Sequence, residues 1–473
     1  MSQQYQYGMI GLGTMGRNLV LNIADKGFAV AGYDRDSKQV ALLNKEADGK
    51  NLKAFDQLEN FIQSLSSPRV IMLLVPAGKI VDAVISDLTG YLKAGDIIMD
   101  CGNSHFTDTV SRIAKLKENN IHFVGTGVSG GESGARFGPS IMPGGDPEVY
   151  QLLSPMLEAI SAKVLGVPCV AYMGNGSAGH YVKMVHNGIE YALMQLIAES
   201  YHLLKKYCGL SNEELHKVFA GWNERKLQSF LIEITAAIFI QEDEHSKEML
   251  IDKIKDTAHQ KGTGAWMSQD AMNIPAPIPA IDAAVSQRII SSMKSERVLA
   301  GNHATPENTE NINSNKADFI NQLEDALHAA FIITYAQGMA MLQAASAVYK
   351  FNTNIATVAS IWRGGCIIRA AMLEVINNAF AKEPALKNLM QNDIFKEQLN
   401  KEIYSLRGIL KSAINKGIPV PALYACNSYY ESYHSVWLPA NLIQAQRDFF
   451  GAHTYERNDQ EGTFHTKWNQ LIQ

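Results

Sequence analysis

Five polar side chains with proton-transfer or hydrogen-bonding chemistry share one face of a short helical segment. Residues 179–191 follow a helical pattern, and at about 3.6 residues per turn one face collects Lys183, His186, Asn187, Glu190 and Tyr191. A lysine with a lowered pKa can accept the hydroxyl proton when a secondary alcohol is oxidised, and a glutamate two turns away can act as a separate acid. The face therefore has the residue types for proton transfer on a hydroxylated substrate.

A solvated surface is the simpler explanation for this polar face, because lysine and glutamate on a helix usually face water. The core-facing side of the helix is a separate apolar stripe, formed by Val182, Val185, Ile189, Leu193 and Leu196. The polar face is therefore available for another role, and the rest of the sequence must decide between the two explanations.

The beginning of the chain carries a dinucleotide-binding pattern. A short strand at residues 7–10 runs into Gly11-Leu12-Gly13-Thr14-Met15-Gly16, and a helical run follows. The first glycine allows a tight turn, the second lets the backbone approach a pyrophosphate, and the third lets the helix pack on the strand. The amino end of the helix attracts the phosphates. A second strand at residues 28–33 ends in Asp34-Arg35-Asp36, where such folds contact the ribose. A merely glycine-rich turn is the weaker explanation.

Further strand-like runs, at residues 70–75, 97–100 and 122–125, alternate with helical ones and predict a parallel sheet. Ligands of such sheets bind beyond the carboxyl ends of the strands. We therefore expect the cofactor and substrate cleft to be bordered by the segments that follow, Pro76-Ala77-Gly78, Cys101-Gly102-Asn103-Ser104 and residues 126–131.

The length and the sequence pattern of the chain predict three parts. Its 473 residues, 46% of them hydrophobic, are too many for one core. We expect an α/β Rossmann-type dinucleotide-binding domain at residues 1–177, a large all-α substrate and dimerisation domain at residues 178–438, and a C-terminal tail at residues 439–473. The tail looks too polar to fold alone, and we expect it to be disordered or docked on a partner.

Composition argues against several classes of partner. The formal net charge of −5 disfavours nucleic acid and anionic membranes, which require a basic surface. No secretory signal and no run of about 18 apolar residues is evident, so we expect a cytoplasmic chain without a membrane partner. The five cysteines are widely spaced and odd in number, and we interpret them as reduced core residues.

A metal-dependent reaction is the alternative to acid–base catalysis by Lys183, since a divalent ion can also stabilise an enolate. It requires clustered ligands, and no grouping of Asp or Glu stands beside the expected cleft. His180 and His186 also lack the i, i+4 spacing of a two-histidine helical site. We therefore predict no metal.

Five segments resemble the decarboxylating 6-phosphogluconate dehydrogenases, and the match spans essentially the whole chain. They are residues 125–132, 138–145, 179–191, 261–264 and 438–454. The resemblance implies oxidation of 6-phosphogluconate by a nicotinamide cofactor, loss of carbon dioxide and release of ribulose 5-phosphate, a step of the pentose phosphate pathway. It implies that Lys183 acts first as base and then as acid, and that Glu190 protonates carbon 1.

The same resemblance implies a set of binding residues and a homodimer with shared active sites, because the tail of such proteins reaches into the neighbouring subunit. The cofactor is expected at the glycine-rich turn, at the ribose-reading segment, and at Val75, Pro76, Ala77 and Asn103. The substrate is expected to meet Asn103, Ser129, Gly130 and Gly131 near its carboxylate, His186 and Asn187 at its hydroxyls, and Tyr191, Lys261, Thr263, Arg288 and Arg447 at its phosphate, with His453 nearby.

The identity of the cofactor depends on conflicting signals. Most members of the family carry Asn-Arg-Ser or Asn-Arg-Thr where this chain has Asp34-Arg35-Asp36. An acid there usually binds the free ribose hydroxyl of NAD and repels the extra phosphate of NADP, whereas Arg35 favours that phosphate. We expect NADP because Arg35 is kept, with NAD as the alternative. A second departure is Pro76, where many members have lysine.

Two other functions remain open at this stage. A 3-hydroxyacid dehydrogenase without decarboxylation would share the cofactor pattern and Lys183, but it has no need of the phosphate residues Lys261, Arg288 and Arg447. A cofactor-binding scaffold that has lost catalysis would be favoured if Lys183 or Glu190 were replaced, and both are present.

Overall fold

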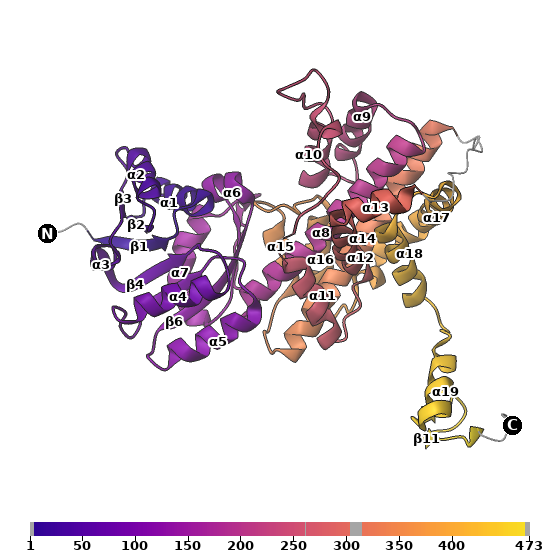
Figure 1. The fold of residues 1–473 in the computed structure, drawn as a ribbon. Helices are drawn as coiled ribbons and strands as arrows, with labels where there is room; N and C mark the ends of the chain where they lie inside the picture. Colours follow the sequence, from indigo (N-terminus) through magenta and orange to yellow (C-terminus); the bar gives the residue numbers. More distant parts are fainter. Residues whose placement is uncertain (1–3, 261, 303–314, 469–473) are drawn as a thin grey trace. The chain divides into compact units, whose positions relative to one another are not determined.

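The computed structural model describes residues 4–260, 262–302 and 315–468. The chain divides into two compact units, Met1–Cys426 and Asn427–Gln473. Within the first unit, a part built on a β-sheet is followed by a helical part that begins at α8 (Ala178–Lys206) (Figure 1). The predicted fold class is thereby confirmed, and the three domain boundaries remain predictions.

A seven-stranded sheet forms the centre of the first part, in the order β3-β2-β1-β4-β5-β6-β7. β1 to β6 are parallel, and β7 at the edge runs antiparallel to β6. The strands are β1 (Tyr5–Ile10), β2 (Val30–Tyr33), β3 (Leu52–Phe55), β4 (Leu65–Leu73), β5 (Ile97–Asp100), β6 (His122–Ser129) and β7 (Ser140–Pro143).

The predicted parallel sheet is confirmed for β1 to β6, but the strand predicted at residues 122–125 is too short and the antiparallel edge strand β7 was not predicted. β6 continues to Ser129 because its second half pairs with β7, in a register that joins Thr126 to Pro143 and Ser129 to Ser140. The four residues of β7 are all buried, so they lack the polar alternation that marks a strand in sequence.

Helices cover both faces of the sheet. Each face has its own apolar core, one shared with α1, α2 and α7 and the other with α3, α4 and α5. This three-layer arrangement is the usual way to bury a parallel sheet. The helices of this part are α1 (Thr14–Asp25), α2 (Ser37–Glu46), α3 (Leu58–Gln63), α4 (Lys79–Thr89), α5 (Phe106–Lys117), α6 (Gly131–Phe137) and α7 (Pro147–Ile160), and a hairpin of β8 (Lys163–Val164) and β9 (Val167–Pro168) follows.

The helical part is organised around α14 (Lys316–Val348), which packs against α8 and α17. By length and composition α14 could cross a membrane, but 67% of its most apolar stretch is buried in the protein, as for a core helix. Its other elements are α9 (Asn212–Asn223), α10 (Phe230–Ile238), η1 (Leu250–Asp252), α11 (Thr263–Asn273), α12 (Pro279–Ser292), α13 (Lys294–Gly301), α15 (Ile355–Trp362), α16 (Met372–Lys382), η2 (Leu389–Gln391), α17 (Asp393–Lys416) and α18 (Pro421–Tyr433), which continues into the second unit.

The tail has a local fold, contrary to the expectation that it is too polar for one. It contains α19 (Ala440–Gly451) and a hairpin of β10 (Tyr455–Glu456) and β11 (Thr463–Phe464). A fully buried carboxylate, that of Asp448, joins them. It accepts hydrogen bonds from the backbone N–H groups of Thr454 (2.9 Å) and Thr466 (3.0 Å), from His465 Nδ1 (2.8 Å) and from Trp468 Nε1 (2.7 Å). One acidic side chain thus replaces much of an apolar core.

We predict that Asp448→Ala loosens the tail, because four donors lose their acceptor at once. Hydrogen exchange of residues 440–468 should speed up, while Asp459→Ala, which removes an exposed partner of Arg457, should change little. These donors hold the pKa of Asp448 below its ordinary value, so its stabilisation is present above the unfolded pKa of about 3.9 and is lost only as pH falls through the lower folded value. Unchanged exchange in Asp448→Ala would contradict this role.

Candidate active site

The amino end of α8 lies directly against the backbone of the sheet. A methyl group at Gly127 of β6 would overlap Lys183 Cβ, and one at Gly179 would overlap the carbonyl oxygens of Gly125 and Met142. Only residues without a Cβ allow this approach. Glycine at these positions therefore sets Lys183 against β6, near the carboxyl ends of the parallel strands, where ligands of such sheets bind.

His180 fixes the same end of α8 from the other side. Its Nδ1 lies 2.6 Å from Thr109 Oγ1, and its Nε2 lies 3.0 Å from the carbonyl oxygen of Asp100. Since the carbonyl can only accept, Nε2 carries a proton and Nδ1 accepts from the threonine hydroxyl. Burial lowers the pKa of His180, which matches this neutral form and makes it a structural residue.

Lys183 is buried, with 7% of its surface exposed, and no described residue offers its ammonium a hydrogen-bond acceptor. Burial lowers the pKa of Lys183, and the charge of Glu190 opposes this only in part. The solvated-surface explanation for the polar face is therefore wrong. A buried amine without a partner favours its neutral form, which is the form that accepts a proton.

Glu190 is shifted in the opposite sense. Burial raises the pKa of Glu190, although the charges of Lys183 and Arg288 act against this shift. A carboxyl group with a raised pKa keeps its proton to a higher pH and can deliver it as a general acid. The two predicted catalytic side chains thus share one helix face, and burial shifts each toward its uncharged form.

His186 links this face to β6. Its Nδ1 lies 3.1 Å from Asn187 Oδ1 and 3.7 Å from Glu190 Oε2, and its Nε2 lies 3.2 Å from Ser129 Oγ. The Asn187 oxygen can only accept, so the proton sits on Nδ1 and Ser129 donates to Nε2. Burial lowers the pKa of His186 well below its usual value, and the charge of Lys183 adds to the effect. The structure therefore brings Ser129, His186 and Asn187 together around the lysine and glutamate.

Three of the residues predicted for a phosphate group gather beside this face. Thr263 is the buried first residue of α11, preceded by Gly262 in the left-handed region at φ 93°. The Arg288 guanidinium lies 3.5 Å above the ring centre of Tyr191 and donates to the His259 carbonyl oxygen at 3.1 Å. A helix amino end with a threonine hydroxyl and an arginine suits an anion. Lys261 lies outside the described residues.

The remaining predicted substrate residues are spread over a loop, a turn and the tail. Gly130 and Gly131 have positive φ values of 123° and 62°, and Asn103 is exposed on the loop after β5. Arg447 and His453 are exposed in the second unit, where Arg447 Nη1 donates to Gln444 Oε1 at 3.2 Å. The roles of these residues stay predictions.

The glycine-rich turn has the close packing that its pattern predicts. A methyl group at Gly16 would overlap the Gly11 carbonyl oxygen, whereas one at Gly13 would meet open space. Leu12 is buried, and Thr14 and Met15 begin α1. Gly13 therefore leaves an open approach at the amino end of a helix, which fits a dinucleotide pyrophosphate.

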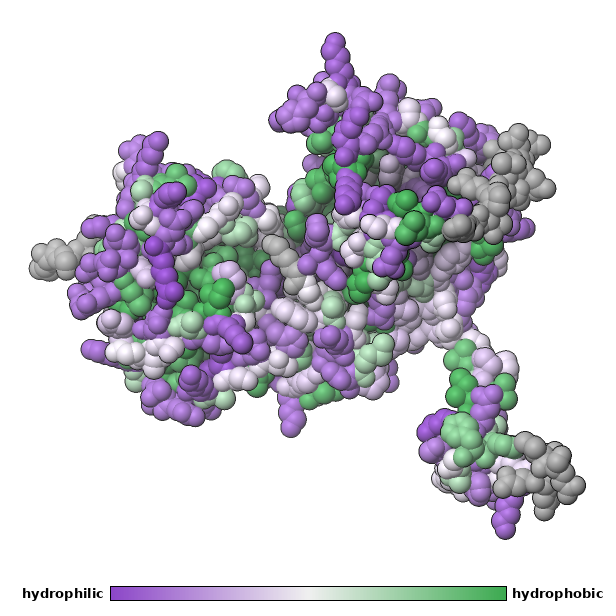
Figure 2. Space-filling view, in the orientation of Figure 1, coloured by the Kyte–Doolittle hydropathy of each residue, from purple (hydrophilic) through white to green (hydrophobic). Residues whose placement is uncertain are grey.

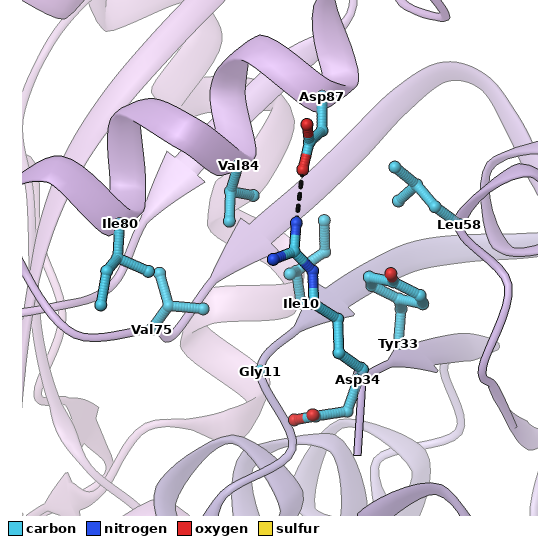
Figure 3. Close-up of a pocket in the computed structure, with 10 residues that line it drawn as sticks. Ile10, Gly11, Tyr33, Asp34, Leu58, Val75, Ile80, Val84 and Asp87 are labelled. Carbon is cyan, nitrogen blue, oxygen red and sulfur yellow. Dashed lines mark hydrogen bonds and ion pairs between the residues drawn. The ribbon is translucent and has the colours of Figure 1, made fainter. Parts of the chain in front are cut away.

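A pocket adjoins this turn (Figure 3). Four predicted cofactor residues line it, and its walls are formed by Ile10, Gly11, Tyr33, Asp34, Arg35, Leu58, Val75, Ile80, Val84 and Asp87. Pro76 and Ala77 follow Val75 and are exposed. The pocket combines apolar walls with a charged end, as the nucleoside half of a dinucleotide requires.

The three residues at the end of β2 have separate partners. Asp34 Oδ2 accepts from the Leu12 N–H (2.7 Å) and its Oδ1 from the Asp36 N–H (2.9 Å). Asp36 caps α2 by accepting from the Lys38 N–H at 2.9 Å. The Arg35 guanidinium pairs with Asp87 at 2.6 Å. Asp34 thus fixes the glycine-rich turn as well as facing the pocket.

Sequence reasoning missed the charged group that supports the cleft loops. Arg112 lies 3.3 Å from Asp100 Oδ2 through Nη1 and donates to the Gly78 carbonyl oxygen at 3.0 Å, and Ser104 Oγ donates to the same Asp100 oxygen at 2.6 Å. The buried pair ties the loop after β4 to the loop after β5, which carries Asn103. A lone arginine in a helix gives no sequence signal of such a role.

A second missed element is the turn that contains Gly365. Its carbonyl oxygen accepts from the Ser140 N–H at 2.8 Å, and a methyl group at Gly130 would come within 2.6 Å of it. The Gly364-Gly365 pair could have indicated this turn. Metal ligands are not grouped anywhere in the described part of the chain, where no three His, Cys, Asp or Glu side chains are placed to hold an ion. The five cysteines are buried and unpaired, as expected.

Comparison with known proteins covers both parts of the chain. The family model described as the NAD binding domain of 6-phosphogluconate dehydrogenase matches residues 6–174. The model described as 6-phosphogluconate dehydrogenase, C-terminal domain, matches residues 179–468. The chain is 50% identical over 468 residues to the NADP(+)-dependent, decarboxylating 6-phosphogluconate dehydrogenase of Bacillus subtilis, with 99% of this chain and 100% of that protein covered.

Two further relatives agree with these matches. The decarboxylating 6-phosphogluconate dehydrogenase of Staphylococcus aureus strain N315 is 46% identical, with 98% of this chain and 99% of that protein covered. A solved structure of Plasmodium falciparum 6-phosphogluconate dehydrogenase, described in its apo form and in complex with NADP+ and with 6-phosphogluconate, has a TM-score of 0.95 at 42% identity and covers 98% of this chain and 100% of its own. The chain therefore belongs to the 6-phosphogluconate dehydrogenase family.

Proposed function

We propose that this chain oxidises 6-phosphogluconate with NADP, releases carbon dioxide and forms ribulose 5-phosphate. The observation that carries the proposal is the placement of a buried lysine and a mostly buried glutamate on one face of α8, where burial lowers the pKa of Lys183 and raises that of Glu190. A reaction that first removes and later returns protons needs one group of each kind. The names of the relatives and the NADP+ and 6-phosphogluconate complexes of the Plasmodium enzyme support the substrate and cofactor.

In the oxidation step, neutral Lys183 accepts the proton of the carbon 3 hydroxyl. The nicotinamide, when bound, supplies the acceptor for the hydride that leaves the same carbon. Neutral His186 and Asn187 hold substrate hydroxyls, and Ser129 with Gly130 and Gly131 receives the carboxylate. Because His186 is kept uncharged, it adds no positive charge beside the base.

In the decarboxylation step, Lys183 is an ammonium and protonates the carbonyl oxygen of the 3-keto acid. The bond to the carboxylate carbon breaks, carbon dioxide leaves, and the electron pair forms an enediol. Protonated Glu190 then delivers a proton to carbon 1, which yields ribulose 5-phosphate. Lys183 is neutral once it has protonated the carbonyl oxygen, and it becomes an ammonium again when it takes the hydroxyl proton of the enediol. Over the cycle Lys183 has gained one proton and Glu190 has lost one, so passage of one proton from Lys183 to Glu190, through solvent, restores the resting state.

The residues of the first part fit a bound NADP. The open approach at Gly13 and the amino end of α1 suit its pyrophosphate, and Val75, Pro76, Ala77 and Asn103 are further residues assigned to the cofactor. Arg35 is assigned to the ribose phosphate, since a guanidinium binds phosphate oxygens in pairs. NAD remains the alternative because of Asp34.

The enzyme is proposed to act as a homodimer in the cytoplasm, with Arg447 and His453 completing the phosphate site of the neighbouring subunit. The second unit exposes many large apolar side chains, visible as green surface in Figure 2. A water-exposed cluster of this density favours burial against another protein surface. Its members are Val436, Trp437, Leu438, Leu442, Ile443, Phe449 and Phe450.

The proposed function is tested by following NADP reduction and carbon dioxide release with 6-phosphogluconate. The wild-type chain should form both products in equal amounts, and Lys183→Met should lower kcat by about 10³-fold or more while the fold is kept, because proton transfer accompanies hydride loss. Lys206→Met, at an exposed position of the same helix, should be silent. Reduction without carbon dioxide would indicate the non-decarboxylating alternative, and cofactor binding without turnover would indicate a scaffold.

A second prediction concerns Asp34. Asp34→Asn should lower the KM for NADP relative to that for NAD, because one negative charge near the ribose phosphate is removed. The lost hydrogen bond to the glycine-rich turn affects both cofactors alike, so the ratio of the two KM values isolates the charge. A ratio equal to that of the wild type would show that Asp34 acts on the turn alone.

The third prediction concerns shared active sites. Lys183→Met and Arg447→Ala homodimers should each be nearly inactive. When the two variants are unfolded and reassembled together, each mixed dimer should regain one intact site, which gives about a quarter of wild-type activity if subunits pair at random. Absence of recovery in verified mixed dimers would mean that Arg447 does not serve the partner's site.

A further inference from the structure

The geometry of the pocket in Figure 3 points to Asp87 as a residue that sets cofactor selectivity. We propose that its carboxylate competes with the ribose phosphate of NADP for Arg35 and so weakens NADP binding without affecting NAD. The proposal rests on the proposed use of a nicotinamide dinucleotide. The competing contact is the 2.6 Å ion pair between Arg35 Nη2 and Asp87 Oδ2, drawn as the dashed line.

Asp87 differs from the two other acids near Arg35 in what it binds. The Asp34 oxygens accept backbone N–H groups, and Asp36 caps α2. Among the described residues, Asp87 is the acid whose carboxylate pairs with the guanidinium. A phosphate that binds Arg35 must therefore displace Asp87, whereas Asp34 and Asp36 can keep their partners.

The position of Asp87 also places a second negative charge near the incoming phosphate. It lies near the end of α4, the helix that also supplies Ile80 and Val84 to the pocket wall, while Arg35 follows β2. Repulsion between Asp87 and the ribose phosphate, and loss of the Arg35–Asp87 pair, both weaken binding of that phosphate. The free ribose hydroxyl of NAD carries no charge and needs no arginine, so both effects are specific for NADP.

The size of the effect follows from exposure. The side chains of Arg35 and Asp87 are 74% and 46% exposed, so water and salt screen their attraction. An exposed pair of this kind changes an equilibrium by about fivefold or less. Asp87 therefore adjusts the preference between the two cofactors and does not exclude either.

The test is calorimetric binding of NADP and of NAD to the full-length protein, without substrate, so that the result does not depend on turnover. Asp87→Asn should tighten NADP binding about threefold to fivefold and change NAD binding less than twofold. The gain should shrink at high salt, and it should be much smaller in the Arg35→Ala background. Glu118→Gln removes one exposed negative charge from the same part of the chain, outside the pocket, and should leave both affinities unchanged.

Each of the following results would overturn the proposal. Weaker NADP binding in Asp87→Asn would show that Asp87 holds Arg35 in position for the phosphate. An equal gain for NADP and NAD, or a full gain in the Arg35→Ala background, would show that competition for Arg35 is not the cause. If the wild-type protein does not bind NADP, the cofactor assignment itself is wrong. If the wild-type protein binds NADP and Asp87→Asn binds it with the same affinity, only the role of Asp87 is rejected.

Discussion

The site depends on the direct contact between the amino end of α8 and the backbone of β6 and β7. Glycine at positions 127 and 179 removes the side chains that would hold the helix away from the sheet. The contact carries Lys183 into the protein interior beside Gly127. Without this approach the polar face of α8 would be an ordinary solvated surface. The arrangement of the predicted catalytic residues is therefore a consequence of packing two backbones together.

Burial then decides the protonation states. Opposite charges on Lys183 and Glu190 would attract, but the two side chains form no ion pair within 4.0 Å in the described residues. Desolvation is the larger influence on both pKa values, since each shifts toward its uncharged form against the pull of the other. An amine with a lowered pKa and a carboxyl group with a raised pKa on one helix face are what successive proton removal and return require.

Much of this organisation could be predicted from local sequence patterns. The glycine-rich turn and the face of α8 follow from spacing that is read along one segment, and both were predicted. Arg112, Asp87 and Asp448 were missed because their partners are distant in the chain or, for Asp448, because two of its four donors are backbone N–H groups. The antiparallel edge strand β7 was missed for a related reason, because only its pairing with β6 defines it as an antiparallel strand and its four residues are all buried. The functional residues were more predictable than the residues that position them, because sequence motifs are local and the positioning contacts join distant parts of the chain.

The central claim is that burial lowers the pKa of the Lys183 amine in the resting protein. NMR titration of protein labelled with carbon-13 at the lysine ε position measures this directly, with Lys183→Met to assign the signal. One lysine should titrate well below the ordinary pKa of about 10.4, and its signal should vanish in Lys183→Met. If the signal that disappears in the variant titrates with the exposed lysines, Lys183 is an ordinary ammonium and the proposed base chemistry is wrong.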